Sequence, residues 1–153
     1  MSLDDDLSKI ESVVVGCETE LKNKSFSATA IAYRLRGIAD PAARTAKGNA
    51  LAGWLAEKCE TLDIERLLEL REQNPENPRI NDLGRRAASC CAALQYIILS
   101  VLQTLDSPNS ETLEAKKQAS ALMGVMAHIR NIFSGARPKP APAPPASPPK
   151  AAE

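Results

Sequence analysis

The sequence predicts an all-α protein, a helical bundle of about five or six helices with a disordered Pro/Ala-rich C-terminal tail. Apolar residues recur every three or four positions over most of the 153-residue chain. No segment alternates apolar and polar residues as a half-buried strand would. The apolar share of 44% comes mainly from Ala, Leu, Ile and Val, with only 3% aromatic residues, which favours helices over sheets.

The prolines divide the chain into two parts. Seven of the eleven prolines lie between positions 138 and 149, in a segment without large apolar side chains. Such a segment cannot bury enough surface to offset the entropy of ordering. We therefore expect residues 1–136 to form the helical domain and residues 137–153 to be a disordered tail. Lys139 and Lys150 lie near P-x-x-P spacings, which aromatic grooves recognise, but we expect a plain spacer.

The first helix is expected from Leu3 to Leu21. Ser2 is a good N-cap, and the aspartates at 4–6 favour the positive end of the helix dipole. Apolar residues then alternate in steps of four and three, at Leu3, Leu7, Ile10, Val14, Cys17 and Leu21. A stripe this narrow faces either the core or a second copy of the chain.

The middle of the chain is less regular. Two short helices are expected. One lies around Phe26 to Ile38 and is capped at Ser25 or Ser27, and the other lies at 64–70. Between them, Asp40 and Pro41 pair an N-cap with a proline at the first helical position, which opens a helix to about position 60. Glycines weaken this helix by roughly 1 kcal/mol each relative to alanine. We interpret these two, Gly48 and Gly53, as helix-packing glycines.

A long central helix is expected from Pro78, behind the cap Asn77, to Asp106. Its seam comprises Ile80, Leu83, Ala87, Cys90, Leu94, Ile97 and Val101, and further apolar residues lie on its other faces. A helix apolar on several sides is normally surrounded by its neighbours, and Gly84 is its one weak point. The last helix repeats a strict seam at Ala115, Ala119, Leu122, Met126, Ile129 and Phe133.

The sequence also indicates the cellular compartment of the protein and the oxidation state of its cysteines. The amino terminus lacks the basic and then apolar regions of a secretory signal, and polar residues interrupt the apolar stretch 87–105. We expect a cytoplasmic protein without a membrane span. In that compartment we expect the four cysteines to be reduced residues of the core; they are Cys17, Cys59, Cys90 and Cys91. No C-x-x-C pair occurs to support a metal site. Redox sensing is the smaller alternative.

Catalytic signals are weak. The single histidine, His128, adjoins the seam residue Ile129 and therefore lies off the predicted core face. No local pattern supplies a nucleophile and an orienting carboxylate, and no phosphate-binding loop or Glu-x-x-His motif occurs. We expect no enzyme, no cofactor and no metal.

Charge is balanced overall but unevenly distributed. Lys plus Arg and Asp plus Glu both number 19, so net charge attracts neither nucleic acid nor an anionic membrane. Acids dominate the first helix, whereas residues 22–58 form a basic stretch with Lys22, Lys24, Arg34, Arg36, Arg44, Lys47 and Lys58. The stretch is either neutralised internally by the first helix or serves as a docking surface for an acidic protein. A nucleic-acid face is a further alternative, with Phe26, Tyr33 and Trp54 for stacking.

We therefore expect a non-enzymatic protein–protein interaction module, such as an adaptor, chaperone-like or inhibitor helical bundle. The expected partner-binding residues are Arg34, Arg36, Arg44 and Lys47. A nucleic-acid-binding regulator that uses the basic stretch 22–58 is the first alternative, and a small helical enzyme that uses His128 is the second. Self-association into a homo-oligomer through a terminal helix also stays open.

Overall fold

The computed structural model describes residues 2–105 and 110–134, and every regular element in those residues is a helix. The elements are α1 (Leu3–Leu21), the 3-10 helix η1 (Lys24–Phe26), α2 (Ala28–Arg36), α3 (Pro41–Glu60), α4 (Ile64–Gln73), α5 (Pro78–Gln103) and α6 (Ser110–Phe133). The predicted all-α bundle is confirmed. The expectation for the tail, residues 137–153, lies outside the described residues.

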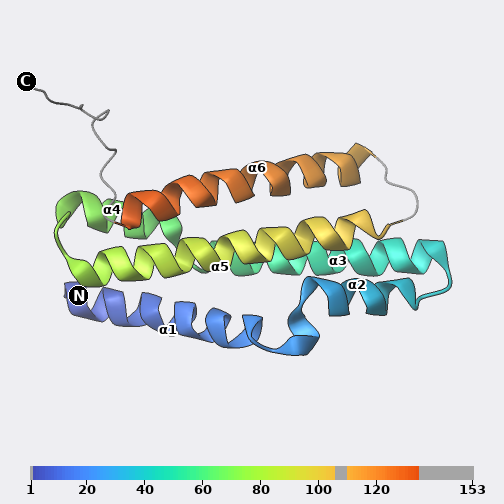
Figure 1. The fold of residues 1–153 in the computed structure, drawn as a ribbon, viewed down its shortest axis with the longest axis horizontal. Coiled ribbons are helices and arrows are strands. Elements are labelled where there is room, and N and C mark those ends of the chain that lie inside the picture. The colour runs from blue at the N-terminus through green and yellow to red at the C-terminus, as the bar shows by residue number, and fades with distance from the viewer. Residues whose placement is uncertain (1, 106–109, 135–153) are drawn as a thin grey trace, which may run out of the picture.

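The helices run along the long axis of the molecule, and α1 with α2, then α3, α5 and α6 follow it in alternating directions (Figure 1). α1 and α2 follow one another along one side, α3 returns behind α5 toward α4, and α6 returns over α5. α5 lies within packing distance of all five other α-helices. This arrangement confirms α5 as the central member of the bundle.

Local capping explains where the helices begin. Ser2 accepts a hydrogen bond from the backbone N–H of Asp5 (3.2 Å), and Asp40 accepts one from Ala43 (3.3 Å). Asn77 accepts from the N–H groups of the second and third residues of α5 at 2.9 and 3.3 Å. These side chains satisfy donors that have no partner inside the helix. These three predicted caps are confirmed, as is Ser27, which accepts from Ala30 at the start of α2, and α5 ends three residues before the predicted position 106.

The predicted seams face the core within one chain. On α1 the buried residues are Leu7, Ile10, Val14 and Cys17. On α6 they include Ala119, Met126, Ile129 and Phe133. α5 carries its predicted seam and a second one beside it, which includes Ala88, Cys91, Ile98 and Leu102. The stripes of the first and last helices are therefore covered without a second copy.

The glycines differ from their sequence interpretation in two cases. A Cβ at Gly48 would lie 2.6 Å from Leu105 Cδ2, so this packing glycine is confirmed. Gly53 has no atom within 4 Å of such a Cβ, so its predicted packing role is wrong. Gly84, expected to be a weak point, instead permits a close contact, because a Cβ there would lie 2.1 Å from Phe133 Cδ1.

Among the described residues, α5 is long and apolar enough to cross a membrane by length and composition alone. The other helices bury 56% of its most apolar window. Its apolar character is accounted for by its central position, because a helix surrounded by neighbours needs apolar side chains on several faces.

Candidate protein-docking site

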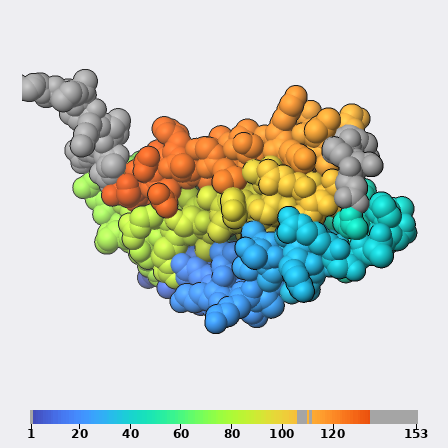
Figure 2. All heavy atoms as spheres, turned by 45° about the vertical axis from the view of Figure 1, so that its right-hand side comes forward, coloured from blue at the N-terminus to red at the C-terminus, as the bar shows by residue number. Residues whose placement is uncertain are grey.

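The four predicted partner-binding residues lie on two neighbouring helices. Arg34 and Arg36 belong to α2, and Arg44 and Lys47 belong to α3. In Figure 2, α2 and the first turns of α3 form the lower right of the visible surface. Arg34, Arg36 and Lys47 are exposed, whereas Arg44 is half-buried. The structure thus gathers the four residues in one region but gives them different environments.

The two arginines of α2 do not share a face. Ile31 and Leu35 turn into the core, and Tyr33 lies opposite them with 78% of its surface exposed. Positions two apart on a helix diverge by about 200°, which places Arg34 and Arg36 on the two flanks of α2 with Tyr33 between them. The Arg34 flank and the Arg36 flank therefore meet different neighbours.

Arg44 is held by the loop between α2 and α3. Its Nε and Nη2 donate hydrogen bonds to the Ile38 carbonyl oxygen at 3.1 and 2.7 Å. A guanidinium bound in this way fixes the turn between the helices. Arg44 consequently supports the shape of the site, and its hydrogen bonding is directed inward.

The Arg34 flank of α2 faces a cavity of about 290 Å³ between η1, α2 and α3. The cavity is lined by Glu20, Asn23, Ser25, Phe26, Ile31, Arg34, Leu51 and Trp54. Lys47 lies one turn before Leu51, on the same flank of α3, and so at the edge of the cavity. The region therefore combines a hollow that is apolar on one part of its wall, at Phe26, Ile31, Leu51 and Trp54, with cations at its margin.

Two aromatic rings form the wall of this cavity. The rings of Phe26 and Trp54 meet edge to face, with centroids 6.0 Å apart and planes at 72°. Lys58 Nζ lies 5.1 Å from the centre of the Trp54 ring and forms an ion pair with Glu20. Trp54 still exposes 48% of its surface. Exposed indoles are among the side chains that most often contribute to protein interfaces.

No protein family, curated protein or solved structure matches this chain.

The acids of α1 pair mainly with arginines outside the basic stretch. Arg66 of α4 pairs with Asp6 (2.9 Å), and Arg79 and Arg86 of α5 pair with Glu11 (3.0 Å) and Glu18 (2.7 Å). The ion pair between Lys58 and Glu20 joins α1 to the basic stretch 22–58. Among the described residues, no ion pair engages Arg34, Arg36 or Lys47. The cations around the cavity therefore keep their charge toward solvent.

The other candidate chemistry is dispersed. His128 is exposed on α6. In the described part of the chain, no three His, Cys, Asp or Glu side chains gather where they could hold a metal ion. We assign no catalytic role to His128.

Sequence reasoning found the cations of the site but missed its apolar half. The three-four spacing places Phe26, Ile31, Leu51 and Trp54 among the apolar residues of two expected helices, and the only further role predicted for Phe26 and Trp54 is stacking on nucleic acid. The spacing of Lys47, Leu51 and Trp54 on one flank of α3 is a signal that was available, because such residues are neighbours on a helix surface. The closure of the cavity by η1 has no local signal.

Proposed function

We propose that the chain is a non-enzymatic protein–protein interaction module that binds an acidic segment of a partner protein. The docking face consists of Tyr33, Arg34, Lys47 and Trp54, with the cavity between η1, α2 and α3 at its centre. An apolar side chain of the partner fills the cavity while its carboxylates face Arg34 and Lys47. Arg36 extends the positive surface along the other flank of α2.

The observation that carries the proposal is that some basic side chains have carboxylate partners and others do not. Three arginines of α4 and α5 have carboxylate partners on α1, whereas Arg34, Arg36 and Lys47 have none among the described residues. Exposed cations of one sign attract an acidic partner and fix its orientation.

The residue types at the face support a protein partner. Tyr, Trp and Arg contribute most often to the energetic centre of protein interfaces, and Tyr and Trp bury large areas at little cost in conformational freedom. A cavity of about 290 Å³ suits one anchoring side chain. These features favour a peptide or helix with a single apolar anchor among acids.

The alternative with a specific observation behind it is a single-stranded nucleic acid. Trp54 exposes its indole beside cations, and bases stack on such rings. The two functions differ in salt dependence, because binding to phosphates weakens steeply as salt is added.

Affinity capture from extract of the native cell, with and without nuclease treatment, tests the proposal. The baits are the wild-type chain, the variant Arg34→Glu/Lys47→Glu and the matched variant Lys117→Glu/Arg130→Glu, which reverses two exposed charges on α6. We expect a protein that binds the wild type and the α6 variant but not the face variant. Equal capture by all three baits contradicts the docking face, and a partner lost only on nuclease treatment supports nucleic acid.

A further inference from the structure

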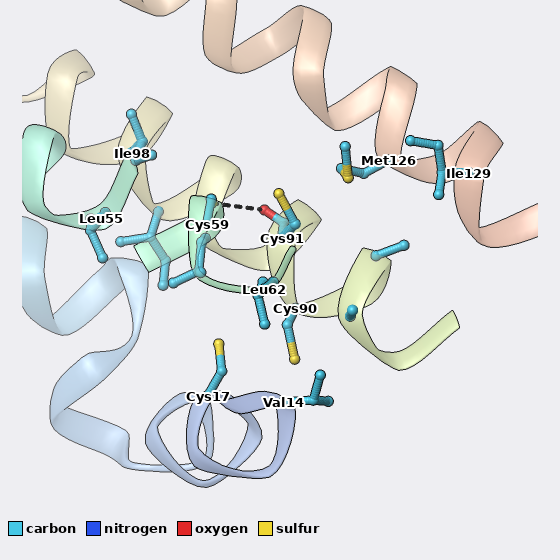
Figure 3. Packing of buried hydrophobic residues seen from close by; sticks show 14 of the residues in the cluster. Val14, Cys17, Leu55, Cys59, Leu62, Cys90, Cys91, Ile98, Met126 and Ile129 are labelled. Carbon is cyan, nitrogen blue, oxygen red and sulfur yellow. Dashed lines mark hydrogen bonds between the residues drawn. The ribbon is translucent and has the colours of Figure 1, made fainter. Parts of the chain in front are cut away.

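The four cysteines form two contacting pairs. Cys17 of α1 and Cys90 of α5 point toward one another (Figure 3), and each thiol shifts the pKa of the other. The Cys59 thiol of α3 donates a hydrogen bond to the backbone carbonyl oxygen of Cys91 of α5 at 3.8 Å (Figure 3), and the two thiols shift each other's pKa. Neighbouring positions on a helix diverge by about 100°, so adjacent cysteines of α5 reach two different helices.

We propose that these pairs are dithiol sites that a peroxide oxidises to two disulfides, Cys17–Cys90 and Cys59–Cys91, which fasten α1 and α3 to α5. All four thiols are free and buried in the reduced chain. Four cysteines can pair in three ways, and the contacts of the folded chain select this one. The inference is independent of the docking face.

A small oxidant reaches each pair from a cavity. Cys59 and Cys91 both line a hollow of about 630 Å³ bounded by α3, α4, α5 and α6. Cys90 lines a second hollow of about 530 Å³ between α1, α5 and α6. Hydrogen peroxide is not much larger than water, so either hollow admits it.

The surroundings of each pair distinguish its two thiols. The hydrogen bond from Cys59 lowers the pKa of Cys91, while the same contact and burial raise the pKa of Cys59. The buried Gln95 donates a hydrogen bond from Nε2 to Cys59 Sγ at 3.3 Å. In the other pair, Cys90 lowers the pKa of Cys17. The thiolate is the reactive form, and either sulfur of a pair can attack the peroxide while the other then closes the same disulfide.

The reaction is balanced within each pair. The thiolate attacks one peroxide oxygen, the O–O bond breaks, and a sulfenic acid and one water form once a proton is taken up. The second sulfur then attacks the sulfenic sulfur, the S–S bond forms, the S–O bond breaks, and a second water leaves. Two thiols lose two protons and two electrons, and one peroxide takes up both to give two waters.

The test uses the full chain, reduced and then treated with stoichiometric hydrogen peroxide. Remaining thiols are blocked, and the protein is digested with trypsin without reduction. The cysteines fall in fragments 10–22, 59–66 and 87–116, the last of which holds both Cys90 and Cys91. We expect the mass of the intact oxidised protein to be lower by four hydrogens. In the digest, we expect a species in which fragments 10–22 and 59–66 are both attached to fragment 87–116.

Two variants assign the pairing. Cys91→Ala is expected to release fragment 59–66 and keep 10–22 attached, and Cys90→Ala is expected to do the reverse. Fragmentation of the wild-type species between Cys90 and Cys91 gives the same assignment if either variant fails to fold. As a control, oxidation in denaturant is expected to give mixed pairings.

Three results would overturn the proposal. The first is that the thiols of the folded chain stay reduced after peroxide treatment. The second is that fragment 10–22 is joined to fragment 59–66. The third is that Cys91→Ala releases fragment 10–22 and Cys90→Ala releases fragment 59–66.

Discussion

The ring of Phe133 rests directly on the backbone of α5 at Gly84, where a Cβ would lie 2.1 Å from the ring atom Cδ1. Phe133 is fully buried at the end of α6. The contact lets the end of α6 approach α5 more closely than any side chain at position 84 allows. It therefore sets the position of the last helix on the bundle.

Replacing Gly84 with alanine is predicted to destabilise the chain by about 1–3 kcal/mol, because the new methyl group overlaps the Phe133 ring. This loss outweighs the roughly 1 kcal/mol that alanine gains over glycine in a helix. Urea unfolding followed by circular dichroism measures it. Gly16→Ala is the control, since no atom lies within 4 Å of a Cβ there. Equal stability of the two variants would mean that Phe133 does not pack on Gly84.

The sequence predicts the helices of this fold better than their contacts. Asp40 and Asn77 mark helix starts because capping is local, and the three-four spacing of apolar residues marks each core face. Gly84 was misinterpreted because the residue that requires it, Phe133, is distant in the sequence. A glycine inside a helix looks like a cost until its partner across the interface is known.

Glu18 and Arg86 form a two-point ion pair between α1 and α5. Arg86 Nε and Nη2 donate to the two carboxylate oxygens of Glu18 at 3.0 and 2.7 Å, and this bonding lowers the pKa of Glu18. A group whose pKa is lowered by folding contributes stability above its unfolded pKa and loses it as pH falls through its folded pKa.

Glu18→Gln is therefore predicted to lower the free energy of unfolding by about 1 kcal/mol at pH 7. The deficit is expected to shrink as pH falls below the ordinary glutamate value of 4.5, where the wild-type carboxylate also takes up a proton. Urea unfolding of both proteins from pH 7 to pH 3 gives the comparison. A deficit that stays constant with pH would assign the effect to packing.

Arg44 and Lys47 are predicted to differ although both are cations near the start of α3. Arg44→Met removes two hydrogen bonds to the Ile38 carbonyl oxygen and is expected to cost about 1–2 kcal/mol. Lys47→Met changes an exposed side chain and is expected to stay within about 0.5 kcal/mol of the wild type. Thermal and urea unfolding measure both. Similar losses in the two variants would contradict the structural role of Arg44.

The sequence predicts the cations of the candidate site but not their roles. The divergence of Arg34 from Arg36 follows from helix geometry and was available from the spacing alone. The capture of Arg44 by Ile38 depends on how the loop folds back, which no local pattern encodes. Likewise, the cysteine pairs required the mutual placement of α1, α3 and α5.

Site-specific photo-crosslinking in the native cell tests the docking face most directly. A photoreactive phenylalanine analogue replaces Tyr33 on the face or, as the matched control, Tyr96 on α5, since both are exposed aromatic positions at 78% and 55%. We predict a discrete, nuclease-resistant protein adduct from position 33 that position 96 does not give. The same adducts from both positions, or a nucleic-acid adduct from position 33, would contradict the account.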